Sequence, residues 1–216
     1  MTTSKTLAAA GAVAALVALA GSPASAAPDA TVSRSDVYFF GDPETSVGWS
    51  TLQRTDDGVL ATFVANEIPP EHAVTLWWVV FNDPENCSAP GCGEDDIFAG
   101  GDPAAGLNAE GIAAADIVAG YAGGTVASPD GHVHLSAGLD VDEIGPEKIV
   151  GEGALLKDVA GAEIHLVLRS HGPAIEGQTD VQTTSYAGGC ETMLLPPEIA
   201  EAEGECVDLL FSMHLP

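Results

Sequence analysis

The stretch GAEIHLVLRSHG, from Gly161 to Gly172, has the clearest strand pattern in the chain. Successive side chains of a β-strand point to opposite faces, so alternate residues share a face. One face of this stretch is apolar and holds Ile164, Leu166 and Leu168. The other face carries a mixed set of side chains, namely Glu163, His165, Val167 and Arg169. The alternation predicts a strand that buries its apolar side and around which the other strands assemble.

A second stretch, AVTLWWVVF at 73–81, is apolar on both faces except at Thr75. Such a continuous apolar run is typical of a strand in the middle of a sheet with protein packed on both sides. Trp77 and Trp78 then point to opposite faces, and both are predicted core residues. The alternative for Trp77 is a binding role, if its face opens into a pocket.

Short alternating segments separated by turn residues continue along the chain, at 36–40, 47–54, 59–65, 112–119, 132–139 and 207–213. The sequence Asp56-Asp57-Gly58 between two of them indicates a hairpin turn. Helical periodicity is almost absent, and only 153–159 allows a turn or two of helix. The pattern predicts an all-β fold, an antiparallel sandwich or barrel, and of these we expect a β-sandwich with few or no helices.

The first 26 residues are predicted to be a signal peptide rather than part of the fold. Lys5 provides the positive start, residues 7–20 form an apolar run of 14 residues, and Ala24-Ser25-Ala26 matches a cleavage site. A membrane anchor is the alternative, but a span needs about 20 apolar residues. We therefore expect a signal peptide at 1–26, secretion to the extracellular or cell-envelope exterior, and a single domain over 27–216 with no membrane contact after cleavage.

The charge balance is strongly acidic, with 32 Asp and Glu residues against 6 Lys and Arg residues and a net charge of −26. A surface of this charge repels nucleic acid and anionic membranes, so neither is expected as a partner. Three interpretations remain: a solvated surface suited to a saline environment, Ca²⁺ binding in acidic loops, or recognition of a cationic partner. The acidic loops that could bind Ca²⁺ are 94–96 and 140–143, and neither has EF-hand spacing.

The four cysteines, Cys87, Cys92, Cys190 and Cys206, all lie after the predicted signal peptide. An even number of cysteines in an exported protein predicts two disulfides, and four cysteines allow three pairings. We favour Cys87 with Cys92 and Cys190 with Cys206, because each pair brackets a turn-rich loop. The first pair falls in a long segment, 82–106, and structured loops of this length are often functional.

Four histidines could hold a metal ion. His132 and His134 are two residues apart on a predicted strand, so both rings leave the same face. His165 and His171 lie on or just after the strand within 161–172. If the two strands are neighbours, these histidines form a three- or four-ligand site for Cu or Zn. The alternative is that they are strand-end histidines on a solvated face, each bonded to the backbone or to a carboxylate.

Arg169 is a further candidate binding residue, because it lies two residues before His171. It either pairs with a carboxylate as a structural ion pair or binds an anionic ligand. The chain has no nucleophile elbow, phosphate-binding loop, metalloprotease motif or paired-carboxylate motif. No serine has a recognisable activating context, so the sequence identifies no catalytic residue.

Two motifs, TLWWVVFNDPENCS at 75–88 and AEIHLVLRSHGP at 162–173, resemble a family of exported bacterial proteins over most of the mature chain. A more distant similarity is to the chordin-type domain and to the Cu/Zn superoxide dismutase sandwich, which carry histidine-bearing strands between glycine-rich turns. The resemblance implies an immunoglobulin-like or Cu/Zn superoxide dismutase-like β-sandwich. It implies no activity, since 75–78 stands where the chordin-type domain has His-x-His and the dismutase ligands have no residue-by-residue match.

Together these patterns predict an exported acidic β-sandwich that serves as a binding or structural module rather than as an enzyme. Its partner would be a small molecule, a metal ion or a protein, and Arg169 and Trp77 are the candidate binding residues. The alternative is a metal-binding protein or metalloenzyme that uses Cu or Zn at His132, His134 and His165, with His171 as a fourth ligand.

Overall fold

The computed structural model describes residues 30–188, 190 and 206–216. The predicted signal peptide at 1–26 lies outside these residues. In the described part of the chain, the strands form one antiparallel sheet in the order β6-β3-β2-β1-β9-β8-β4-β5-β7. Strands β6 and β7 are its two edges, so the sheet is not closed into a barrel.

The sheet is built from nine strands within the described residues. They are β1 (Thr31–Phe39), β2 (Asp42–Arg54), β3 (Gly58–Ala65), β4 (His72–Phe81), β5 (Ile117–Val126), β6 (Val133–Asp140), β7 (Lys148–Val150), β8 (Glu163–Pro173) and β9 (Cys206–His214). The stretches quoted from the sequence form β8 and β4, which lie side by side near the middle of the sheet.

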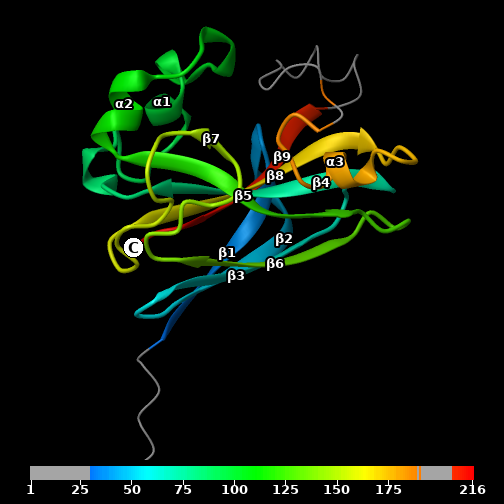
Figure 1. The fold of residues 1–216 in the computed structure, drawn as a ribbon, viewed down its shortest axis with the longest axis horizontal. Coiled ribbons are helices and arrows are strands. Elements are labelled where there is room, and N and C mark those ends of the chain that lie inside the picture. Colours follow the sequence, from blue (N-terminus) through cyan, green and yellow to red (C-terminus); the bar gives the residue numbers. More distant parts are fainter. Residues whose placement is uncertain (1–29, 189, 191–205) are drawn as a thin grey trace, which may run out of the picture.

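The sheet folds over so that its two halves pack against each other across one apolar core (Figure 1). Leu52 and Phe63 enter this core from β2 and β3, and Trp78 and Leu166 enter it from β4 and β8. All four side chains are essentially inaccessible to solvent. The prediction of an all-β, antiparallel, sandwich-like fold is confirmed, and we call the core side of the sheet the inner face.

The hairpin predicted at Asp56-Asp57-Gly58 joins β2 to β3. The backbone N–H and the hydroxyl of Thr55 both donate to the carbonyl oxygen of Gly58, which closes the turn. A Cβ atom at Gly58 would collide with the backbone of Leu139 on β6. Glycine is therefore required here because it lets β3 and β6 approach each other closely.

The predicted strand at 112–119 is wrong in its first part. Helix α2 (Ala109–Ala114) occupies it, and β5 begins only at Ile117. Asn108 caps the helix by accepting a hydrogen bond from the backbone N–H of Gly111 at 3.1 Å. The alanines of this segment favour helix, and their alternation carried no real strand signal. The helical turn considered at 153–159 does not form.

The connection between β4 and β5, residues 82–116, holds most of the helical structure, and we call it the roof segment. It contains the short helices η1 (Pro84–Asn86), α1 (Glu94–Ile97), η2 (Ala99–Gly101), η3 (Pro103–Ala105) and α2. Figure 1 shows α1 and α2 together at one end of β4 and β5, with α3 (Thr179–Gln182) at the other end. The roof segment therefore stands over one end of the outer face of the sheet.

Both predicted disulfides form. Cys87 is bonded to Cys92 with 5.3 Å between their Cα atoms, and Cys190 is bonded to Cys206 with 5.9 Å. These distances lie in the normal range for a disulfide. Among the described residues, no helix combines the length and apolar character needed to cross a membrane.

Candidate ligand cavity

A cavity of about 710 Å³ lies on the outer face of the sheet, over β4, β5, β8 and β9. Its wall is mostly apolar and includes aromatic side chains from the β1–β2 turn, from β4, from the roof segment and from β9, namely Phe40, Trp77, Phe98 and Phe211. Pockets of 300–1,000 Å³ with a mainly apolar lining and a few polar groups are typical small-molecule sites. The cavity is therefore the candidate functional site.

The floor of the cavity is set by the register of the strands. Val167 on β8 lies opposite Trp77 on β4 and opposite Phe211 on β9. The next row along the sheet places His165 opposite Val79 and Met213. Because alternate residues share a face, these side chains all project from the outer face while their neighbours fill the core.

Trp77 is buried, as predicted for a core residue. It also forms part of the cavity wall, which is the condition on which the alternative binding role depends. Its ring makes edge-to-face contacts with Tyr121 and Tyr186, at centroid distances of 5.6 and 5.0 Å. Its indole N–H donates to the hydroxyl of Thr75 at 2.7 Å. Contacts within the protein thus fix the orientation of the ring.

The roof segment is held in shape by the disulfide and by one buried carboxylate. Asp96 accepts hydrogen bonds from the backbone N–H groups of Ser88, at 2.7 Å, and Gly93, at 3.0 Å. This fixes the loop around Cys87 and Cys92, and Cys92 lines the cavity. Within the acidic run at 94–96, Asp96 therefore has a structural role.

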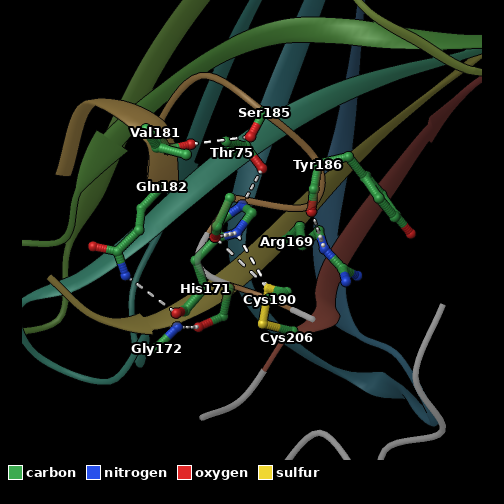
Figure 2. Close-up of a disulfide and its surroundings, with 12 residues drawn as sticks. Thr75, Arg169, His171, Gly172, Val181, Gln182, Ser185, Tyr186, Cys190 and Cys206 are labelled. Carbon is green, nitrogen blue, oxygen red and sulfur yellow. Dashed lines mark hydrogen bonds between the residues drawn. A yellow bond between two sulfur atoms is a disulfide. The ribbon is translucent and has the colours of Figure 1, made fainter. Parts of the chain in front are cut away.

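One end of the cavity carries an ion pair. Arg169 donates to Asp208 at 2.9 Å. It also donates to the backbone carbonyl of Tyr186 at 3.1 Å, and its guanidinium lies 4.0 Å from the centroid of the Tyr186 ring (Figure 2). Arg169 is 2% exposed, whereas the Asp208 side chain is 30% exposed. Arg169 thus forms an ion pair with a carboxylate, which is one of the two roles that the sequence suggested for it.

Tyr186 completes that end of the cavity. Its hydroxyl donates to the second carboxylate oxygen of Asp208 at 3.2 Å. Burial, followed by the nearby charge of Asp208, raises the pKa of Tyr186 above its ordinary value, so the phenol stays protonated and remains a donor. At the mouth, partial burial raises the pKa of Glu94, and Asp95 and Asp208 add to the effect.

A second polar group lies in the floor at the other end. His165 Nε2 is 2.7 Å from Glu163 Oε1, and that oxygen also accepts the backbone N–H of Cys92 at 3.0 Å. Glu163 and His165 are both buried, and the His165 ring packs against Phe81 with 4.8 Å between centroids. A carboxylate bonded to one ring nitrogen fixes the orientation of the imidazole.

The four histidines considered as metal ligands do not come together. His132 and His134 belong to the β6 side of the molecule, where β6 is an edge strand, and β8 is five places away in the sheet order. His132 Nδ1 is hydrogen-bonded to Asn66 Oδ1 at 3.0 Å, and His134 is exposed. The condition for the Cu or Zn site, that the two strands be neighbours in the sheet, is not met.

His171 lies near the ion-pair end of the cavity, next to the Cys190–Cys206 disulfide (Figure 2). Its Nε2 is 2.8 Å from the hydroxyl of Thr75, and its Nδ1 is 2.7 Å from the carbonyl oxygen of Gly188. Burial lowers the pKa of His171 to about 4, and the Arg169 charge contributes. Both ring nitrogens are used within the protein.

Within the described residues, one group of three potential metal ligands has its ligand atoms within 4.8 Å of one another: Cys87, Cys92 and Asp96. Its two sulfur atoms are bonded to each other, so they are not thiolate ligands. The acidic loops at 94–96 and 140–143 do not gather three carboxylates in this way in the part of the chain that the structure describes.

Several residues of the cavity were not identified from the sequence. Asp208 and Tyr186 contact Arg169 but are 39 and 17 residues from it in the sequence. Phe211 belongs to the last strand. The available signal was the alternation in 207–213, which places Phe211 and Met213 on one face of a strand. No protein-family model and no curated protein matches this sequence.

Proposed function

We propose that the protein is an exported binding protein that holds an apolar small molecule in the outer cavity. The observation that carries the proposal is the cavity itself, with a volume of about 710 Å³ and a mainly apolar, aromatic wall. Removing apolar surface from water stabilises a complex by roughly 25 cal/mol per Å². A neutral apolar molecule of drug-like size suits such a site.

The charge of the protein narrows the ligand class. The cation at the cavity, Arg169, is already paired with Asp208, and the protein as a whole carries a net charge of −26. Long-range repulsion disfavours the approach of anions to such a surface. Neutral apolar molecules are therefore favoured over fatty acids and other anionic amphiphiles.

Export is supported by two features. The sequence of residues 1–26 matches a signal peptide, and two disulfides suit an oxidising compartment. A protein outside the cell that holds apolar molecules would keep them dispersed in water or deliver them to the cell.

The proposal is tested by filling the cavity. Val167 lies half-buried at the centre of the floor, so Val167→Phe places added bulk in the ligand space. The fluorescence of N-phenyl-1-naphthylamine, a neutral apolar probe, reports binding. We expect wild type to bind it and Val167→Phe to bind it about tenfold more weakly or worse, equivalent to about 1.4 kcal/mol.

The matched control is Leu60→Phe, which adds a ring at a position that is 51% exposed on β3 and outside the cavity. This variant should bind the probe like wild type. Circular dichroism and the melting temperature verify that both variants fold. Absence of probe binding by wild type, or equal binding by wild type and a folded Val167→Phe variant, would overturn the proposed function.

A further inference from the structure

We propose that Nδ1 of His165 is the hydrogen-bond acceptor that orients the ligand, so that the cavity selects apolar molecules carrying a hydroxyl group. This inference rests on the proposed function, because it concerns the specificity of the same cavity. It assigns to His165 a role in recognising an alcohol or phenol rather than in holding a metal ion.

The first step concerns the tautomer of the ring. Glu163 Oε1 accepts the backbone N–H of Cys92 and lies 2.7 Å from His165 Nε2, so the carboxylate is an acceptor at this point. A neutral imidazole has one donor and one acceptor nitrogen. In a neutral His165 whose Nε2–H donates to Glu163, Nδ1 keeps its lone pair and accepts, and this is the state that we propose binds the ligand.

The second step concerns access to Nδ1. Among the described residues Nδ1 of His165 has no hydrogen-bond partner. No buried side-chain nitrogen or oxygen in that part of the chain lacks a partner, so Nδ1 must border open space. The His165 side chain is only 9% exposed and lines the cavity. The open nitrogen is therefore reached from the ligand space.

The third step concerns the neighbours of His165. Its row of the floor is apolar, with Val79 and Met213 on the adjacent strands and Phe81 against the ring. A charged ligand group placed there would lose its hydration without a counter-charge, since Glu163 is already engaged by His165 and Cys92. A neutral hydroxyl needs only one acceptor, which Nδ1 provides.

The test compares two probes that differ in one donor. 2-Naphthol and 2-methoxynaphthalene share the same apolar body, but only 2-naphthol donates a hydrogen bond. We expect wild type to bind 2-naphthol about tenfold more tightly, as a single neutral hydrogen bond in a buried site predicts. Isothermal titration calorimetry gives both dissociation constants, and displacement of N-phenyl-1-naphthylamine verifies that the probes occupy the cavity.

The variant His165→Phe removes the acceptor and keeps a planar ring. Its preference for 2-naphthol should fall to about one, whereas His134→Phe, at an exposed histidine on β6, should keep the wild-type preference. If wild type binds both probes equally while displacing the apolar probe, this inference is wrong and the proposed function stands. If wild type binds neither but still binds N-phenyl-1-naphthylamine, this inference is again wrong and the proposed function stands; if it binds none of the three probes, the proposed function itself fails.

A second measurement keeps the inference testable if His165→Phe does not fold. The ¹⁵N chemical shifts of the wild-type imidazole show which nitrogen carries the proton. We expect an unprotonated Nδ1 whose signal shifts with 2-naphthol and not with its methyl ether. A protonated Nδ1, or the same response to both probes, would overturn the assignment.

Discussion

The two faces of β8 are both buried, yet they are built differently. The inner face carries Leu166 and Leu168 into a sealed apolar core, where neither side chain has any solvent exposure. The outer face carries His165, Val167 and Arg169 along a cavity. Packing alone accounts for the inner face. The outer face keeps polar groups and open volume, and this difference supports the proposed binding function.

The largest effect should come from pH, and it compares one histidine from each face. His214, on the inner side of β9, contacts the hydroxyls of Ser33 and Ser50 at 2.8 and 2.9 Å. Burial lowers its pKa to about 4, with a contribution from the charge of Arg54. Burial lowers the pKa of His171, on the outer face, to about 4 as well.

The sign follows from the unfolded state. Between pH 6.5 and 4 an unfolded histidine takes up a proton while the folded one stays neutral, so stability is full above pH 6.5 and falls as the pH drops to about 4. Each histidine contributes about 3 kcal/mol to this loss. Urea unfolding across this range should show it, and His171→Gln should flatten the profile. An unchanged profile in that variant would contradict the assignment.

Truncating neighbouring residues of β8 compares the faces directly. Leu166→Ala should lower the free energy of unfolding by about 3 kcal/mol, because it leaves a void in the sealed core. Val167→Ala should cost only about 1 kcal/mol, because it enlarges a space that already exists. Urea denaturation measures both. Equal costs would mean that the outer face is packed as tightly as the inner one.

The two disulfides differ in the length of chain they close. Cys190 and Cys206 are 16 residues apart, and Cys87 and Cys92 are 5 apart. Replacing both cysteines by serine should cost about 3 kcal/mol for the first pair and about 2 kcal/mol for the second, since longer loops lose more entropy when closed. Only the second replacement disturbs the roof segment, so it should weaken probe binding more. Thermal melts and probe titrations of the two double variants separate these effects.

Asp208→Asn should lower the free energy of unfolding by about 2 kcal/mol. It removes the negative charge that pairs with the buried Arg169 guanidinium at this position, and the partial exposure of Asp208 allows water to compensate. Glu94→Gln, at the exposed mouth of the same cavity, should change stability by less than about 0.5 kcal/mol. Equal losses of unfolding free energy in the two variants would show that the Arg169–Asp208 ion pair does not stabilise the fold.

Local patterns were enough to predict most strands and both disulfides. The alternation in 161–172 placed Glu163, His165, Val167 and Arg169 on one face of β8, where the structure has them. The helix at Ala109–Ala114 was missed because alanine carries little information about which face is buried.

The site could not be predicted to the same extent, because it depends on which strands are neighbours. Sequence alternation gives the face of a residue but not the position of its strand in the sheet. His132 and His165 therefore looked like partners although five steps of the sheet separate their strands. Asp208 lies opposite Arg169 because the β8–β9 register shifts between Leu168 and Arg169. The sequences of the two strands contain no pattern that predicts this shift.

The roof segment has a consequence for protein engineering. It enters after Phe81 and leaves before Ile117, and these two residues are paired partners on adjacent strands. The 35 residues from 82 to 116 thus form a long hairpin connection whose ends are already fixed by the sheet. Such an insertion can be exchanged as a cassette, so libraries built in this segment would vary ligand selectivity on an unchanged, disulfide-containing scaffold.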